Sequence, residues 1–171
     1  MLMKSLKELI NDILNSSENK ELENIKRNPT MIKEITNPTE AQQLAAVRSS
    51  SHVIKYIKEP AKKVRFIALK DDIYNYRHIK NLTAKEQLYL IKEGISIKNI
   101  QKPVEKVQLY ALKWRKASIN DIKNPTEKAQ LITIRKDKEL FLYIKNPTIT
   151  VCQEVARAYC GNIEIPADRR M

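Results

Sequence analysis

The tripeptide Asn-Pro-Thr recurs along the chain at an almost constant interval. Intact copies lie at 37–39, 124–126 and 146–148, and degenerate copies lie between them at 59–61, 81–83 and 102–104. The central residues, at 38, 60, 82, 103, 125 and 147, are 22 residues apart except for one interval of 21. A fixed period in this range is typical of solenoids, in which each repeat packs on its neighbours. The sequence therefore predicts a stack of about six repeats of ~22 residues.

Each complete copy has the chemistry of a helix start. Asn37 and Asn124 are the expected N-caps, and Pro38 and Pro125 are the expected first helical residues, where a missing N–H costs nothing. Glu40 and Glu127, two residues after these prolines, would complete a capping box. The tripeptide thus predicts the beginning of an α-helix in every repeat.

Apolar residues recur at fixed distances behind each Pro, which is counted here as position 0. Positions +6 and +9 are three residues apart and form the expected buried face of a helix of about ten residues. Positions +16 and +19, mostly isoleucine, predict a second, short α or 3₁₀ segment. Position +5 is mostly glutamine, for which we expect hydrogen bonds between repeats, with contacts to a ligand as the alternative: Gln43, Gln87, Gln108 and Gln130.

The expected fold is an all-α, right-handed α-solenoid that forms one domain over 1–171. Capping helices are expected within 1–27 (one over 2–15 and another over 18–27), repeats over 28–160, and a C-terminal tail over 161–171. Gly94 is expected in a tight left-handed turn that absorbs the shorter interval. Cys152 and Cys160 would be too far apart on one helix for a disulfide, and we expect them in the core of a cytoplasmic protein.

The repeat resembles two families of short α-solenoid, the HEAT-like repeats and the variant leucine-rich repeat. The resemblance rests on the Asn-Pro pairs and on the Leu44-Ala45-Ala46-Val47 type of core, and it covers roughly residues 28–160. The units are a few residues shorter than those of the variant leucine-rich repeat, and the cysteine cluster that binds an iron–sulfur centre in some members is missing. The resemblance implies an architecture, because such folds carry many unrelated functions.

Basic residues also follow the period, in a chain whose formal net charge is +12. Position +3 is lysine in four central repeats, and position +10 is lysine or arginine throughout. Because these positions are seven residues apart, they lie on the same side of the helix. Four repeats supply the candidate contacts to a polyanionic or acidic partner: Lys63, Lys70, Lys85, Lys92, Lys106, Lys113, Lys128 and Arg135.

The periodic cations could also serve the fold alone. Position +10 ends a helix, where a cation complements the helix dipole, and position +3 can belong to a solvated outer face. Aromatic residues near the cations favour binding, since Tyr89 and Tyr110 at +7 could stack on bases. Trp114 lies in the densest basic-aromatic segment, Lys113-Trp114-Arg115-Lys116, and is expected to be a binding or packing residue. Filling the space between helices is the alternative role of the two tyrosines.

We expect a non-enzymatic scaffold that binds nucleic acid, a nucleoprotein or an acidic protein surface. The alternative is a protein–protein adaptor or inhibitor, such as a phage-encoded inhibitor of a nucleoprotein complex, that uses a concave face with Tyr56, Tyr76, Tyr143 and Lys58. No catalytic residues, cofactor, metal or small-molecule substrate are expected, and no membrane contact. A DNA-glycosylase function, known among HEAT-like proteins, would need a carboxylate near Trp114, and the nearest in sequence are Asp121 and Asp137.

Overall fold

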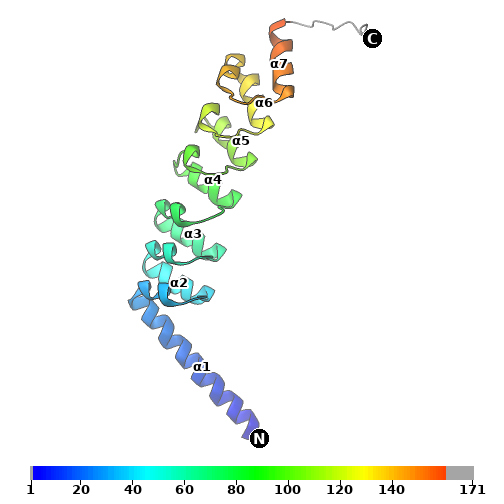
Figure 1. The fold of residues 1–171 in the computed structure, drawn as a ribbon. Coiled ribbons are helices and arrows are strands. Elements are labelled where there is room, and N and C mark those ends of the chain that lie inside the picture. Colours follow the sequence, from blue (N-terminus) through cyan, green and yellow to red (C-terminus); the bar gives the residue numbers. More distant parts are fainter. Residues whose placement is uncertain (1, 161–171) are drawn as a thin grey trace. The chain divides into compact units, whose positions relative to one another are not determined.

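The computed structural model describes residues 2–160, which form helices and connecting turns without any strand. The chain falls into two compact units, Met1–Leu82 and Thr83–Met171, and each is described by itself (Figure 1). In both units an α-helix alternates with a short 3₁₀ helix, and consecutive repeats pack on one another. The predicted α-solenoid is thereby confirmed, whereas the right-handed sense of the stack stays a prediction.

The first unit has three α-helices and three 3₁₀ helices. They are α1 (Leu2–Arg27), η1 (Pro29–Glu34), α2 (Glu40–Ser49), η2 (Ser51–Tyr56), α3 (Lys62–Asp71) and η3 (Ile73–His78). The second unit continues the alternation with four α-helices and three 3₁₀ helices. They are α4 (Ala84–Lys92), η4 (Ile97–Asn99), α5 (Glu105–Lys113), η5 (Ile119–Asp121), α6 (Glu127–Lys136), η6 (Lys138–Tyr143) and α7 (Ile149–Cys160).

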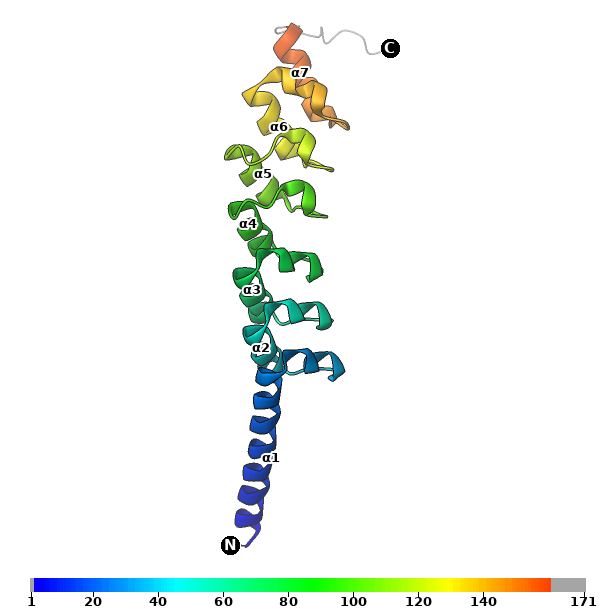
Figure 2. The same ribbon diagram turned by 90° about the vertical axis from the view of Figure 1, so that its left-hand side faces the viewer.

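Each unit consists of two layers, one of α-helices and one of 3₁₀ helices. In the first unit α2 contacts α3 while η2 contacts η3, and in the second unit α5 contacts α6 while η5 contacts η6 (Figure 2). The isoleucine column at +19 lies between the layers, and all five members are buried: Ile57, Ile79, Ile100, Ile122 and Ile144. The short second segments predicted from this column are therefore confirmed.

The α-helices begin two residues later than the sequence predicted. Thr39, not Asn37, is the N-cap of α2, and Gln42 completes the capping box by accepting from the Thr39 N–H at 2.8 Å. Thr83 and Thr126 are the N-caps of α4 and α6, and Thr83 also forms a capping box, with Glu86. The prediction of Asn37 and Asn124 as N-caps was wrong, because the threonine hydroxyl accepts from the N–H three residues on while the Pro stays outside the helix.

The glutamine column at +5 joins successive repeats, as predicted. Gln108 donates from Nε2 to the carbonyls of Pro103 (2.9 Å) and Asn124 (3.2 Å), and its Oε1 accepts from the Thr126 N–H at 2.9 Å. Gln130 repeats the pattern one unit later with Pro125, Asn146 and Thr148. Each side chain is buried and satisfies the polar backbone groups just before the next α-helix.

The buried face of the α-helices differs in part from the predicted one. Position +9 is mainly buried as expected, but position +6 is only half-buried, and position +4 is buried from the second copy onward: Val64, Glu86, Val107, Ala129 and Val151. Position +6 lies toward the outer edge between neighbouring α-helices, where Leu88 and Leu109 line a surface hollow. The sequence pattern missed +4 because this column contains the polar residues Gln42 and Glu86 beside its apolar members.

Two predictions about the ends were wrong. The N-terminal segment is one 26-residue helix rather than two, since no Pro or Gly interrupts Leu2–Arg27. Cys152 and Cys160 lie on α7, as the spacing implied, but both are exposed rather than buried. The predicted tail at 161–171 lies outside the described residues. Among residues 2–160, no helix is long and apolar enough to cross a membrane.

Two neighbouring repeats end their α-helices with a left-handed residue. Gly94 has φ +95°, and the Ile95 N–H reaches back to the Leu90 carbonyl at 2.9 Å, which confirms the predicted tight turn. Arg115 takes the same place after α5 with φ +53°, and the Lys116 N–H reaches the Ala111 carbonyl at 2.8 Å. An arginine in this conformation carries steric strain that a glycine avoids.

Candidate functional site

All eight basic residues predicted as partner contacts are exposed on α-helices. Lys63 and Lys70 lie on α3 of the first unit. The other six lie on three consecutive helices of the second unit, with Lys85 and Lys92 on α4, Lys106 and Lys113 on α5, and Lys128 and Arg135 on α6. The second unit therefore carries most of the predicted contacts.

Two of these cations already have anionic partners in the next or previous repeat. The Lys128 Nζ lies 3.0 Å from the Glu105 Oε1, and the Arg135 guanidinium binds the Glu154 carboxylate through two contacts of 2.6 and 3.0 Å. The hydrogen bond from Arg135 lowers the pKa of Glu154, and Glu154 in turn raises the pKa of Arg135. Lys128 and Arg135 are thus less available to a partner than the sequence suggested.

The equivalent cations one repeat earlier lack such partners, and the sequence explains why. The residue that corresponds to Glu105 is Ala84, so Lys106 has no carboxylate at the place where Lys128 has one. The residue that corresponds to Glu154 is Ile132, which is 42% exposed beside Lys113. Within residues 2–160, neither Lys106 nor Lys113 forms an ion pair.

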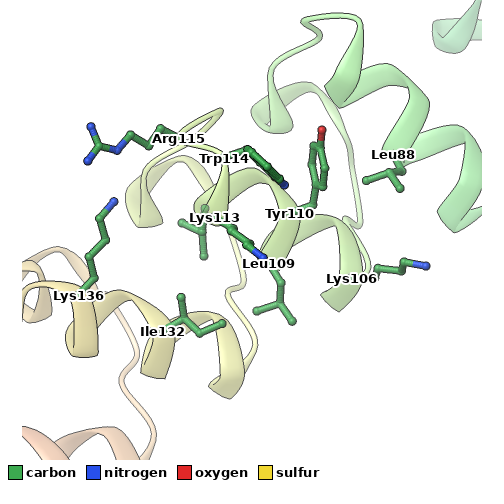
Figure 3. Close-up of a pocket in the computed structure, with 10 residues that line it drawn as sticks. Leu88, Lys106, Leu109, Tyr110, Lys113, Trp114, Arg115, Ile132 and Lys136 are labelled. Atoms are coloured by element: carbon green, nitrogen blue, oxygen red, sulfur yellow. The ribbon is translucent and has the colours of Figure 1, made fainter.

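Lys106 and Lys113 line one hollow of about 630 Å³ on the α-helical layer of the second unit. We call this hollow the basic pocket. Its lining combines residues of α4, α5, α6 and the turn after α5: Leu88, Lys106, Leu109, Tyr110, Leu112, Lys113, Trp114, Arg115, Ile132 and Lys136. Figure 3 shows Arg115 and Lys136 on one side of the pocket, Lys106 and Leu88 on the other, and Tyr110 with Trp114 between them.

The two aromatic rings of the basic pocket are neighbours. The ring centroids of Tyr110 and Trp114 are 6.2 Å apart with planes inclined by 43°. A cation lies near each ring, since the Lys92 Nζ is 5.8 Å from the Tyr110 centroid and the Lys113 Nζ is 5.9 Å from the Trp114 centroid. Trp114 is 59% exposed, which is a large accessible area for an indole. The pocket therefore presents a planar apolar surface surrounded by positive charge.

Hydrogen-bond donors dominate the polar side chains of this lining. Lysine ammonium groups, the Arg115 guanidinium and the Trp114 indole N–H can only donate, and only the Tyr110 hydroxyl can also accept. The floor is aliphatic, with Leu109, Leu112 and Ile132. Chemically, the pocket suits a ligand that is anionic, rich in acceptors and partly planar or apolar.

A second hollow, of about 760 Å³, shares Leu112, Arg115, Ile132 and Lys136 with the basic pocket. It reaches the 3₁₀ layer at Asp121 and Tyr143. The Asp121 carboxylate is held by the Lys98 Nζ at 2.9 Å and by the Ser118 N–H at 2.8 Å, and both bonds lower its pKa. Asp121 therefore has a structural role at η5.

The remaining predicted residues lie elsewhere. Tyr89 is half-buried on α4 and does not line the basic pocket. Of the residues named for the alternative concave face, Tyr56 and Lys58 are exposed in the first unit, whereas Tyr76 is only 8% exposed and belongs to the core. Asp137, the other carboxylate considered for Trp114, accepts from the Glu139 N–H at 3.0 Å and caps η6.

Two cations of the basic pocket, Arg115 and Lys136, were not predicted as contacts from the sequence. Arg115 was visible in Lys113-Trp114-Arg115-Lys116. When the repeats are aligned, Arg115 also takes the position of Gly94 in the previous repeat, and this replacement of a glycine is a signal that the sequence contains. Lys136 follows Arg135 and lies outside the periodic columns, so no repeat signal distinguishes it.

Searches of known proteins returned no matching family model, no matching curated protein and no matching solved structure.

Proposed function

We propose that the protein is a non-enzymatic α-solenoid scaffold that binds a polyanionic partner at the basic pocket of its second unit. The observation that carries the proposal is the set of cations around Trp114 and Tyr110 that have no carboxylate partner within residues 2–160: Lys106, Lys113, Arg115 and Lys136. Unpaired cations on a common face attract polyanions and accelerate their association.

The contrast between neighbouring repeats supports the same conclusion. The cations of α6 are neutralised by carboxylates of the neighbouring repeats, since Glu154 faces Arg135 and Glu105 faces Lys128. For the cations of α5, the neighbouring repeats have Ala84 and Ile132 at these places, and Lys106 and Lys113 stay unneutralised. Local helix stabilisation by the dipole explains a cation at the end of α5, but it does not explain Lys106 in the first turn, where the dipole disfavours a cation.

The proposal extends to family and location. The regular α plus 3₁₀ units support a relationship with HEAT-like and variant leucine-rich repeat folds, which hold partners along an extended face. The unpaired thiols of Cys152 and Cys160 suit a reducing, cytoplasmic location. Nucleic acid, a nucleoprotein and an acidic protein surface are the partner classes that match the charge.

The direct test is binding of the full chain to labelled single- and double-stranded oligonucleotides at about 50 and 200 mM salt. If four cations contact phosphates of a single strand, affinity should fall roughly 50-fold between these salt concentrations. Simultaneous Lys106→Glu, Lys113→Glu, Arg115→Glu and Lys136→Glu substitutions should abolish binding while the circular dichroism spectrum keeps its helical form.

A matched control changes the same number of charges away from the pocket. The four exposed lysines chosen for it precede the Asn-Pro repeats or belong to a degenerate copy: Lys58, Lys102, Lys123 and Lys145. Their reversal should weaken binding far less than reversal of the pocket cations. Equal losses would show that overall charge, not the pocket, attracts the partner, and no binding at 50 mM salt would leave the adaptor function.

Ile132→Glu offers a sharper variant because it removes no cation. It places a carboxylate beside Lys113, as Glu154 stands beside Arg135 in the next repeat. Binding should weaken through neutralisation, whereas Ile132→Gln, which has the same shape without the charge, should leave affinity nearly unchanged. Equal oligonucleotide affinities for the Ile132→Glu and Ile132→Gln variants would show that Lys113 does not contact the partner.

A further inference from the structure

We propose that the basic pocket binds single-stranded nucleic acid by stacking an unpaired base on Trp114 while the surrounding cations hold the flanking phosphates. The inference rests on the proposed function and names its ligand class. The indole of Trp114 is 59% exposed, and its ring centroid lies 6.2 Å from that of Tyr110. Both rings line the basic pocket together with aliphatic side chains. Every base has a planar face that stacks on such a ring without regard to sequence.

The donor-only lining distinguishes nucleic acid from an acidic peptide. Apart from the Tyr110 hydroxyl, the polar side chains of the pocket are lysine, arginine and the indole N–H, which donate hydrogen bonds and accept none. A phosphodiester brings only acceptors, so its oxygens meet their complements here. A peptide backbone brings an N–H donor with every carbonyl, and these donors would lie against ammonium groups and leucine side chains.

Three backbone carbonyls at the end of α5 are already occupied. The carbonyls of Tyr110, Ala111 and Leu112 already accept from the N–H groups of the turn that follows. The turn itself projects Arg115 at φ +53°, where the preceding repeat has Gly94. Strain retained at a residue that lines a pocket points to a role for its side chain beyond the fold.

A single strand fits this arrangement better than a duplex. In a duplex, bases are paired and stacked on each other, so an exposed indole cannot reach their faces without unstacking. In a single strand, a base can turn toward Trp114 while its neighbouring phosphates reach cations on either side. Lys106 and the Arg115–Lys136 side of the pocket lie on opposite sides of the aromatic pair (Figure 3).

Trp114 is the only tryptophan of the chain, so its fluorescence reports on the pocket alone. The experiment titrates the full-length protein with oligothymidine, with an abasic oligomer of the same length and charge, and with polyglutamate. We expect oligothymidine to quench the emission saturably, and the abasic oligomer to bind at least several-fold more weakly without the same quenching. Equal quenching by the two oligomers, or tighter binding of polyglutamate, would overturn the proposal.

Variants at Trp114 test stacking independently of quenching. Measured by anisotropy of labelled oligothymidine, Trp114→Leu should lower affinity roughly tenfold, whereas Trp114→Phe should retain most of it. The abasic oligomer should bind all three proteins alike. If Trp114→Leu binds oligothymidine as tightly as the parent, base stacking fails while salt-dependent polyanion binding stands. If neither oligomer nor polyglutamate binds the parent, both proposals fall.

Discussion

The side chain of Gln108 accepts a hydrogen bond from the Thr126 N–H at 2.9 Å, although the two residues belong to successive repeats. The same side chain donates to the carbonyls of Pro103 and Asn124. A single buried amide thus satisfies backbone groups at the starts of both α5 and α6.

Replacing Gln108 by Leu should destabilise the second unit by about 2–3 kcal/mol. The Gln108 side chain is buried, and the Thr126 N–H and two carbonyls would lose their hydrogen-bond partner. Urea unfolding followed by circular dichroism measures the change. Gln153→Leu, at an exposed position of α7, is the control and should alter stability by less than about 0.5 kcal/mol. Similar free energies of unfolding for the two variants would contradict a structural role for the glutamine bridge.

The N-cap assignment can be tested with two residues of one tripeptide. Thr39→Ala should cost about 1 kcal/mol, since its hydroxyl accepts from the Gln42 N–H, whereas Asn37→Ala should have little effect. Thermal unfolding of both variants is sufficient. A larger loss for Asn37→Ala would restore the helix start that the sequence alone suggested.

Arg115→Gly should raise stability by about 0.5–1 kcal/mol, because glycine adopts the left-handed conformation without steric cost. The same variant should weaken binding of an oligonucleotide, so stability and affinity would change in opposite directions. Gly94→Ala is the matched control. A Cβ at residue 94 meets no atom within 4 Å, so its expected loss of about 1 kcal/mol reports the backbone conformation alone.

If Arg115→Gly instead destabilises the protein, the conformation at residue 115 is not strained, and backbone strain gives no sign of a binding role for Arg115. If stability rises but affinity is unchanged, Arg115 is not a contact.

Acid should weaken the second unit partly through Asp121. Hydrogen bonds from Lys98 and Ser118 lower the pKa of this carboxyl in the folded protein, so its ionised form contributes stability above the unfolded pKa. That contribution is lost as the pH falls from about 4 through the lower folded pKa. Asp121→Asn should therefore show a shallower decline in the free energy of unfolding over this range, and so should Lys98→Met. Parallel pH profiles for the variants and the parent protein would contradict the assignment.

The repeat architecture could be predicted because local signals coincide in every unit. The period, the glutamine column and the isoleucine column each follow from one residue type at one spacing, and each was confirmed. The helix start was misplaced because Asn, Pro and Thr all favour helix N-termini. Only the hydroxyl geometry at Thr39 decides among them.

The site was predictable in part. The columns at +3 and +10 identified Lys106 and Lys113, which indeed line one pocket. Whether a cation is neutralised depends on the residue that the neighbouring repeat places beside it. Arg135 is paired with Glu154, whereas Lys113 has Ile132 at the equivalent place. Lys136 could not be found from periodicity, because the pocket combines side chains of three helices and a turn.

The slope of log affinity against log salt concentration measures whether the four cations of the basic pocket contact phosphates. For single-stranded oligonucleotides, the parent protein and a variant with Ala at Lys106, Lys113, Arg115 and Lys136 should differ in slope by about 3, because each phosphate contact contributes about 0.7. The alanine control at Lys58, Lys102, Lys123 and Lys145 should keep nearly the parent slope. Equal slopes for the parent and the pocket variant would contradict phosphate binding at the basic pocket.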